Sequence, residues 1–237
     1  MTASFCWVAA SAAAAVSGAV LERVLREVDA HRMPAGGFEA VIVITPWKDG
    51  VAQEPGRYVV KSNGDGPVLV EAISHDQRGQ KFLTTDSGIF FFAPRTRRAI
   101  RITPLQVLRG QASVGDIARL RFAADYEPGS TEDENCRPER CLPLLLTSKN
   151  ESSTYARITL YVAHLRSGFS PRQANLFLAS GRLAKKVIYE DGGGAKLPAS
   201  ARYVDAINVR QETTVVYESV RAARFHPSTF NPRFLEQ

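Results

Sequence analysis

The sequence contains little cysteine and no long, strongly apolar run. Three cysteines in 237 residues are too few for a disulfide scaffold. The uncharged stretch at residues 5–20 is short and rich in alanine, whereas a membrane span needs about 20 strongly apolar residues. The 17 glycines and 13 prolines are scattered, and 44% of residues are hydrophobic, so collagen-like and disordered chains are excluded as well. What remains is an ordinary globular protein.

Two of the three cysteines, Cys136 and Cys141, lie in one acidic loop with four residues between them. A disulfide between them is the favoured interpretation, and two free thiols are the alternative. The four histidines lie far from any ligand spacing around this pair, and a zinc site needs about four such ligands, so we expect no metal site. A disulfide implies an oxidising compartment.

Residues 1–15 resemble the apolar and small-residue parts of a secretory signal. The basic region that should precede them is missing, since the first Lys or Arg is Arg23. Either the true leader begins upstream, or this segment is the alanine-rich start of the first helix. No Leu-x-x-Cys pattern precedes Cys6, so lipid attachment is not expected there. We expect an exported protein with a periplasmic location.

Residues 16–237 form one predicted domain, and it opens with a helix. Apolar residues recur at steps of three and four, which predicts an amphipathic helix over residues 16–32 that buries Leu21, Val24, Leu25 and Val28. A second short helix is predicted over residues 113–122. It begins with Ser113 and Asp116 at the spacing of a capping box and presents Ile117 to the core. Both helices are expected to form a lid over the sheet.

The rest of the domain alternates with a period of two, which is typical of strands. About ten strands are predicted, at residues 38–47, 56–64, 66–74, 80–88, 88–103 (a hairpin), 142–150, 156–165, 174–190 (a hairpin), 201–211 and 213–225. The connections are short, so neighbouring strands should be antiparallel. A twisted sheet of this size curls. The fold class is therefore mainly β (α+β), a large curved antiparallel sheet forming an incomplete β-barrel with a helical lid.

One face of this sheet is predicted to be apolar, either as a core that the helices cover or as the lining of a ligand cavity. A two-residue turn at Thr96 would place Phe91 opposite Ile102, and a turn at Ser180 would place Leu178 opposite Leu183. The expected lining residues are Val70, Phe82, Ile89, Phe91, Ile100, Ile102, Ile158, Leu160, Val162, Leu176, Leu178, Leu183 and Val187. The two predicted helices have a combined length near 40 Å, whereas the face of the predicted sheet is about 45 Å wide. The helices would therefore cover that face only in part. The uncovered interior must collapse, bind an apolar ligand or dimerise.

Catalytic signatures are missing from the sequence. It has no Gly-x-Ser-x-Gly, no His-Glu-x-x-His, no phosphate loop and no Gly-x-Gly-x-x-Gly opening a helix. We therefore expect neither an enzyme nor a cofactor. The net charge of +6 favours anionic partners. The densest basic cluster of the sequence comprises Arg95, Arg97, Arg98 and Arg101. This cluster is either a solvated hairpin tip or a docking site for anionic lipid head groups or an acidic protein. Nucleic acid is not expected.

Several segments together resemble one known superfamily. They are the aromatic strand with its basic return strand (88–102), the segment 111–128 ending in Asp-Tyr-Glu-Pro, the paired late strands (155–191) and the terminal Phe-Asn-Pro-Arg-Phe-Leu (230–235). In them the chain resembles the outer-membrane lipoprotein-sorting, LolA/LolB-like superfamily, and its periplasmic lipoprotein-sorting branch in particular. The resemblance implies an incomplete barrel with a helical lid and a cavity for acyl chains. No residue of this sequence could be matched to the arginine that latches the lid in such carriers.

Two functional hypotheses follow. The first is a monomeric periplasmic carrier that binds the acyl chains of a lipid or lipoprotein, touches membranes transiently and shuttles its cargo between them. The resemblance implies that such a carrier works beside an inner-membrane exporter of the resistance-nodulation type. The alternative is a non-catalytic adaptor of an envelope complex whose apolar face docks a partner. The cysteine loop, residues 129–141, departs from the pattern of the founding carrier, which leaves the cargo open.

Overall fold

The structure is a computed structural model that describes residues 18–34, 36–64, 66–95, 98–130, 136, 141–150, 153–165, 168–190 and 200–235. The signal-like segment and Cys6 lie outside these residues, so export stays a prediction. The described chain is mainly antiparallel strand with few helices, as expected for the predicted fold class.

The first helix, α1, runs over Gly18–Arg32 and confirms the amphipathic pattern. Its buried side chains are Leu21, Val24, Leu25, Val28 and, at its end, Arg32. The first four share one stripe because they recur every three to four residues. The helix contacts strand β13 and strand β10, so it lies across residues distant in sequence.

The second predicted helix, residues 113–122, is broken in two. A π-helix, η2 (Gly115–Arg119), is followed by an extended link and by a short helix, α2 (Phe122–Asp125). The predicted capping box does form: the backbone N–H of Ser113 donates to Asp116 Oδ2 over 2.9 Å, and the N–H of Asp116 donates to Ser113 Oγ over 3.3 Å. The chain then turns at Leu120, where ψ is 107° and no longer helical.

The strands form one fourteen-stranded sheet and a separate hairpin among the described residues. The prediction of about ten strands was too low, because several strands are too short to show a period of two. The strand bounds are β1 Phe38–Lys48, β2 Val51–Ala52, β3 Gly56–Ser62, β4 Val68–Ala72, β5 Lys81–Thr85, β6 Gly88–Phe92, β7 Ala99–Ile102, β8 Val107–Arg109, β9 Ala112–Ser113, β10 Tyr126–Ser130, β11 Leu142–Ser148, β12 Arg157–Leu165, β13 Gly168–Phe177, β14 Leu183–Glu190, β15 Ser200–Asp205 and β16 Gln211–Ala222.

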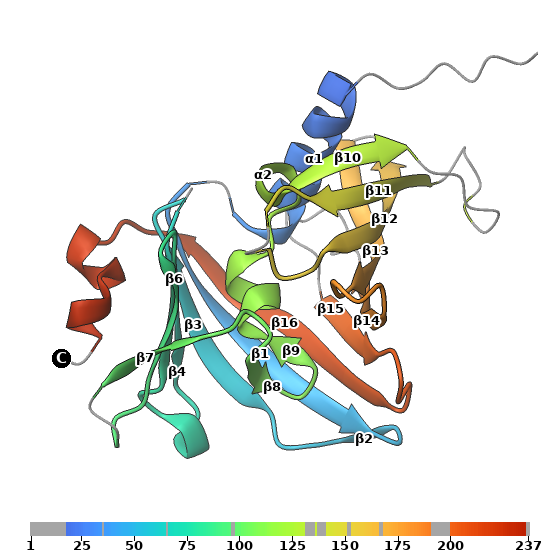
Figure 1. Cartoon of the computed structure of the whole chain (residues 1–237). Coiled ribbons are helices and arrows are strands. Elements are labelled where there is room, and N and C mark those ends of the chain that lie inside the picture. Colours follow the sequence, from blue (N-terminus) through green and yellow to red (C-terminus); the bar gives the residue numbers. More distant parts are fainter. Residues whose placement is uncertain are drawn as a thin grey trace, which may run out of the picture.

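The order of strands in the sheet is β10-β11-β12-β13-β14-β15-β16-β1-β3-β4-β5-β6-β7, with β2 beside β1 and every neighbouring pair antiparallel. Within each half of this order, β1–β7 and β10–β16, successive strands are neighbours, except that β2 pairs with β1 alone. The pairing of β1 with β16 joins the two halves. The ends of this order, β7 and β10, do not pair, so the curved sheet remains an incomplete barrel. Figure 1 shows α1 and α2 at one end of the curve and η2 inside it.

Both faces of the β4–β6 region are covered. The concave face contributes Val70, Phe82 and Ile89 to the main apolar core. The convex face holds a second cluster, in which Leu69, Leu83 and Phe92 pack against the C-terminal residues Phe230 and Leu235. Figure 1 shows this C-terminal segment, with its 3-10 turns η3 (Pro227–Phe230) and η4 (Pro232–Phe234), lying outside the sheet.

The predicted register was wrong in the first hairpin and at the turn end of the second. Phe91 lies opposite Ile100 rather than Ile102, because the β6–β7 connection is longer than two residues. This shift is of two residues, so each side chain keeps its predicted face. In the second hairpin the predicted register is confirmed as far as Leu176, which lies opposite Lys185. A bulge next to Leu176 then places Leu183 opposite Phe177 rather than Leu178.

Candidate functional site

Most of the residues predicted to line the interior do come together on the concave face. Eight of them are at most 3% exposed and belong to one cluster: Val70, Phe82, Ile89, Ile158, Leu160, Val162, Leu176 and Val187. Phe91, Ile102 and Leu178 are partly buried and pack against the same cluster. We call α1 together with residues 115–125 the lid. Its predicted apolar residues Leu21, Val24, Leu25 and Val28 are in this cluster, and Ile117 packs against it.

Two predicted lining residues lie elsewhere. Ile100 is 52% exposed, because it sits on β7 at the end of the sheet, where no neighbouring strand shields it. Leu183 is half-buried and lies outside the core cluster, because the bulge between Leu176 and Phe177 interrupts the alternation of faces. The alternating pattern alone could not reveal either effect.

The space between lid and sheet is largely filled by side chains. A void of about 20 Å³ lies beside Arg32, lined by Met33, Asp116, Tyr189 and Tyr203 among others. Such a volume holds roughly one water molecule. The sequence predicted an interior that two short helices would leave open, whereas here the lid packs into it. An acyl chain would therefore reach the concave face only in place of lid side chains.

A buried ion pair joins the lid to the sheet. Lys185 Nζ is 2.8 Å from Asp116 Oδ2, and the two side chains are 10% and 0% exposed. Asp116 also accepts hydrogen bonds from the hydroxyls of Ser113 (2.8 Å) and Tyr155 (2.7 Å). Lys185 further donates to the carbonyl oxygen of Gln111. Burial raises the pKa of Tyr155, and the Asp116 carboxylate raises it further, so this hydroxyl stays protonated and donates.

Arg32, the last residue of α1, is turned inward and is 7% exposed. Its Nη1 donates to the carbonyl oxygen of Leu120 over 2.9 Å, and its guanidinium lies 4.5 Å from the centre of the Phe122 ring. Its own carbonyl oxygen accepts from the Tyr217 hydroxyl over 3.0 Å. Arg32 therefore joins three parts of the molecule: α1, the 120–122 segment and the sheet.

Asp29 makes the second polar connection within the lid. Its two carboxylate oxygens accept from the backbone N–H groups of Phe122 (3.0 Å) and Ala123 (2.9 Å), which are the first two of α2. Burial raises the pKa of Asp29, while Arg32 and these two N–H groups act in the opposite direction. The two helices of the lid are thus fixed to each other as one unit.

Sequence reasoning singled out Ser113 and Asp116 as a capping box but missed the roles of Arg32, Asp29 and Lys185. Asp29 falls on the charged side of an amphipathic helix, Arg32 lies at the end of that helix, and Lys185 sits beside Lys186 in a strand. None of the three therefore stands out in the sequence. One signal was available: Lys185 has the same parity as Val187 in β14 and therefore shares its inward face.

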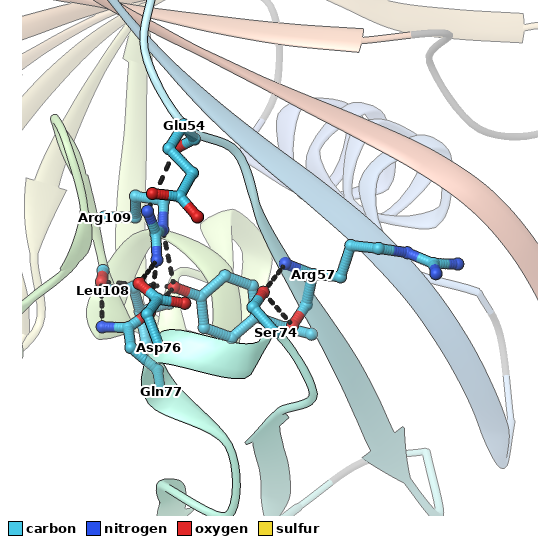
Figure 2. Close-up of polar contacts among 8 residues, drawn as sticks. Glu54, Arg57, Ser74, Asp76, Gln77, Leu108 and Arg109 are labelled. Carbon is cyan, nitrogen blue, oxygen red and sulfur yellow. Dashed lines mark hydrogen bonds and ion pairs between the residues drawn. The ribbon is translucent and has the colours of Figure 1, made fainter.

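A second polar cluster fixes the β8–β9 hairpin to the sheet (Figure 2). The Arg109 guanidinium pairs with Asp76, donates to the Gln77 side chain over 3.1 Å and donates to the carbonyl oxygen of Glu54 over 3.0 Å. The Tyr58 hydroxyl donates to Gln77 Oε1 over 2.6 Å. Asp76 therefore helps to hold a hairpin that packs inside the curve of the sheet (Figure 1).

The predicted basic cluster lies on the β6–β7 hairpin. Arg95, Arg98 and Arg101 are exposed, and Arg97 lies outside the described residues. Arg101 donates to the carbonyl oxygen of Ser87 over 2.6 Å, which uses part of its guanidinium within the sheet. Docking of head groups or of a partner at this cluster stays a prediction.

The predicted disulfide is confirmed. Cys136 is bonded to Cys141, with their Cα atoms 5.4 Å apart, at the side of the sheet that ends in β10 and β11. In the described ranges, no group of three His, Cys, Asp or Glu residues is arranged to hold a metal ion. Over the same part of the chain, no helix is long and apolar enough to cross a membrane.

Comparison with known proteins relates this geometry to solved structures. A family model with the description "Uncharacterized protein" matches residues 67–237. The crystal structure of LolA superfamily protein NE2245 from Nitrosomonas europaea is 28% identical, with a TM-score of 0.80 over 93% of this chain and 100% of the other. No curated protein matches the sequence.

Two more distant structures share the fold alone. One is an outer membrane lipoprotein-sorting protein domain from Vibrio parahaemolyticus, with 15% identity and a TM-score of 0.72 over 91% of this chain and 98% of that one. The other is a DUF1329 family protein from Desulfovibrio piger, with 16% identity and a TM-score of 0.74 over 92% of this chain and 98% of that one. In each of these structures nearly the whole chain corresponds to this one.

Proposed function

Because the chain belongs to the LolA-like superfamily, we propose that it is a periplasmic carrier that binds the acyl chains of a lipid or lipoprotein on the concave face of its sheet. It performs no chemistry on its cargo and acts as a monomer. It shuttles the cargo between membranes, receiving it from or passing it to an inner-membrane exporter of the resistance-nodulation type, as its family resemblance implies. The Cys136–Cys141 disulfide supports the oxidising compartment.

The observation that carries this proposal is that a separate lid, rather than the sheet itself, buries the apolar concave face. The four α1 side chains in the core contribute roughly 6–12 kcal/mol at about 1.5–3 kcal/mol each. An acyl chain of about 14 carbons gains roughly 11 kcal/mol at about 0.8 kcal/mol per buried CH₂. The two quantities are of similar size. A bound chain can therefore replace the lid on the sheet without a large net change in free energy.

Opening must break the polar contacts that hold the lid together and onto the sheet. Arg32 would leave Leu120 and Tyr217, or α1 and α2 would move as one unit with the Asp29 contacts intact. The second route exposes fewer unpaired polar groups, because Asp29 keeps its two N–H donors. We therefore propose that α1 and α2 move as a unit, with Tyr217 at their boundary with the sheet, while Asp116 stays paired with Lys185.

The test is direct binding of a fluorescent fatty acid to delipidated full-length protein, together with native mass spectrometry of the protein as purified. A carrier binds saturably and at one-to-one stoichiometry. Leu160→Phe, which adds volume to the concave face, should weaken binding by about tenfold, while Ile207→Phe at an exposed turn should not. Absence of saturable binding and of any co-purified lipid would overturn the proposal.

The filled interior favours the second candidate function, an adaptor that docks a partner. Three aliphatic side chains gather at neighbouring hairpin ends: Val51, Ile207 and Val209 are 63%, 78% and 65% exposed. The two ends are joined by the backbone hydrogen bond from Asp49 N–H to the carbonyl oxygen of Arg210 over 3.0 Å. An adaptor would bind no lipid and would lose its complex in Ile207→Asp, whereas a carrier with this substitution would still bind a fatty acid.

A further inference from the structure

A groove of about 510 Å³ lies outside the lid, between the end of α1, α2 and the β3–β4 turn. We call it the α1 groove. Its volume falls within the range of roughly 300–1,000 Å³ found for small-molecule sites. Its wall is largely apolar and made mostly of small side chains: Ala30, Met33, Pro34, Phe38, Ala123 and Ala124. Gly36 and Gly64 complete it, and their backbones lie against each other.

Two arginines stand on the lining of the α1 groove, Arg26 from α1 and Arg121 from the start of α2. Arg121 uses one of its five N–H donors on the carbonyl oxygen of Gly66, 2.5 Å away. Arg26 is 63% exposed, and its nearest carboxylate is that of Glu22 at 3.8 Å. The one acid on the lining, Asp29, is already bound by two backbone N–H groups and faces Arg32. The lining therefore has cationic donors to offer.

Met33 connects the α1 groove to the interior. It lines the groove on one side and the void beside Arg32, Asp116 and Tyr203 on the other. It also packs against the main core cluster as a partly buried residue. A methionine has three rotatable bonds in its unbranched side chain and adapts its shape readily. Rotation of this one side chain would join the groove to the space under the lid.

We propose that the α1 groove binds an amphiphile with a single acyl chain and an anionic head, a carboxylate or a phosphate. The head lies between Arg26 and Arg121, and the chain runs over the alanines past Met33 toward the concave face. A neutral head would form no ion pair with the two arginines. This inference rests on the proposed carrier function and adds the chemistry of the head group and the path of the chain.

The test compares three ligands with the same acyl chain: a fatty acid, a lysophosphatidic acid and a monoacylglycerol. Wild-type protein should bind both anionic ligands about tenfold more tightly than the neutral one. Equal affinity for the two anions would show that the groove recognises the negative charge common to the carboxylate and the phosphate. Arg26→Gln should remove most of this preference. The matched control is Arg23→Gln, which changes another exposed arginine of α1 that pairs with Glu27 and lies off the groove.

Photo-cross-linking locates the bound acyl chain directly. A fatty acid with a diazirine on its chain should cross-link to residues 26–34 or 121–124 in full-length protein, at positions located by mass spectrometry. Ala123→Leu, which fills the groove, should reduce both cross-linking and affinity. If wild-type protein binds lipid without preference for an anionic head and cross-links only within strands, the groove assignment is wrong while the carrier function stands. If wild-type protein binds none of the three ligands, both the groove assignment and the carrier function are wrong.

Discussion

The Nη1 atom of Arg32 donates a hydrogen bond of 2.9 Å to the carbonyl oxygen of Leu120, and this bond joins the end of α1 to the link between η2 and α2. A helix that ends in a charged, inward-facing side chain differs from the solvated end that its sequence indicates. The guanidinium is stabilised by Asp29 and by the ring of Phe122. The end of α1 is therefore held by contacts at one residue as well as by apolar packing.

Replacing Arg32 by leucine should loosen the lid. A hydrogen bond to a charged group contributes about 1.5–3 kcal/mol, so amide exchange along α1 should speed up by roughly ten- to a hundredfold. Hydrogen exchange followed by mass spectrometry measures this directly. Arg23→Leu, on the exposed side of the same helix, is the control and should leave exchange unchanged. Equal exchange in the two variants would show that Leu120 does not restrain the helix.

Removing Lys185 should destabilise the fold strongly. Lys185→Met leaves the fully buried Asp116 carboxylate without its cation, and breaking a buried pair in this way costs about 3–5 kcal/mol. Lys186→Met, one residue away on the other face of β14, is the matched control and should cost less than about 1 kcal/mol. Urea unfolding measures both. Similar midpoints for the two variants would contradict the buried ion pair.

Breaking the disulfide should have a modest effect. The bond closes a loop with only four residues between Cys136 and Cys141, so loop closure accounts for about 2 kcal/mol. Cys136→Ser combined with Cys141→Ser should lower the free energy of unfolding by that amount, and reductant should lower the stability of wild-type protein alone. A much larger loss of unfolding free energy would show that the loop stabilises more of the sheet than its position at the end of the sheet indicates.

The raised pKa of Asp29 makes a prediction about pH. Burial raises it above the usual 3.8, so the folded protein retains this proton over a range of pH in which the unfolded chain has lost it. The contribution of this group to stability is complete below the unfolded pKa and falls as pH rises through the folded one. The stability of wild type relative to Asp29→Asn should therefore decrease from pH 3 upward. An increase with pH would show that the two backbone N–H groups lower this pKa instead.

Much of the architecture could be predicted because it depends on local patterns. The stripe of Leu21, Val24, Leu25 and Val28 defines α1, and alternation places Leu160 and Leu176 on the buried face. The capping box of Ser113 and Asp116 also forms as its spacing indicates. Short connections between strands were enough to predict antiparallel pairing throughout the sheet.

What could not be predicted depends on events at single positions or on distant partners. The bulge next to Leu176 shifts a register, and no residue type there announces it. The inward turn of Arg32 depends on the carbonyl oxygen of Leu120, which is 88 residues away in sequence. How completely a lid fills a concave face depends on how it is placed, and helix length alone does not determine that.

The pairing of β1 with β16 has a consequence for biogenesis. Phe38 lies opposite Ala222, so the strand that is synthesised first acquires one of its two neighbours only when the last strand has emerged. Contacts between such distant residues form slowly, and until then the edge of β1 exposes unpaired backbone groups to other chains. A nascent chain that leaves the ribosome or crosses a membrane from its amino end thus stays incomplete, and open to chaperones, until its final residues arrive.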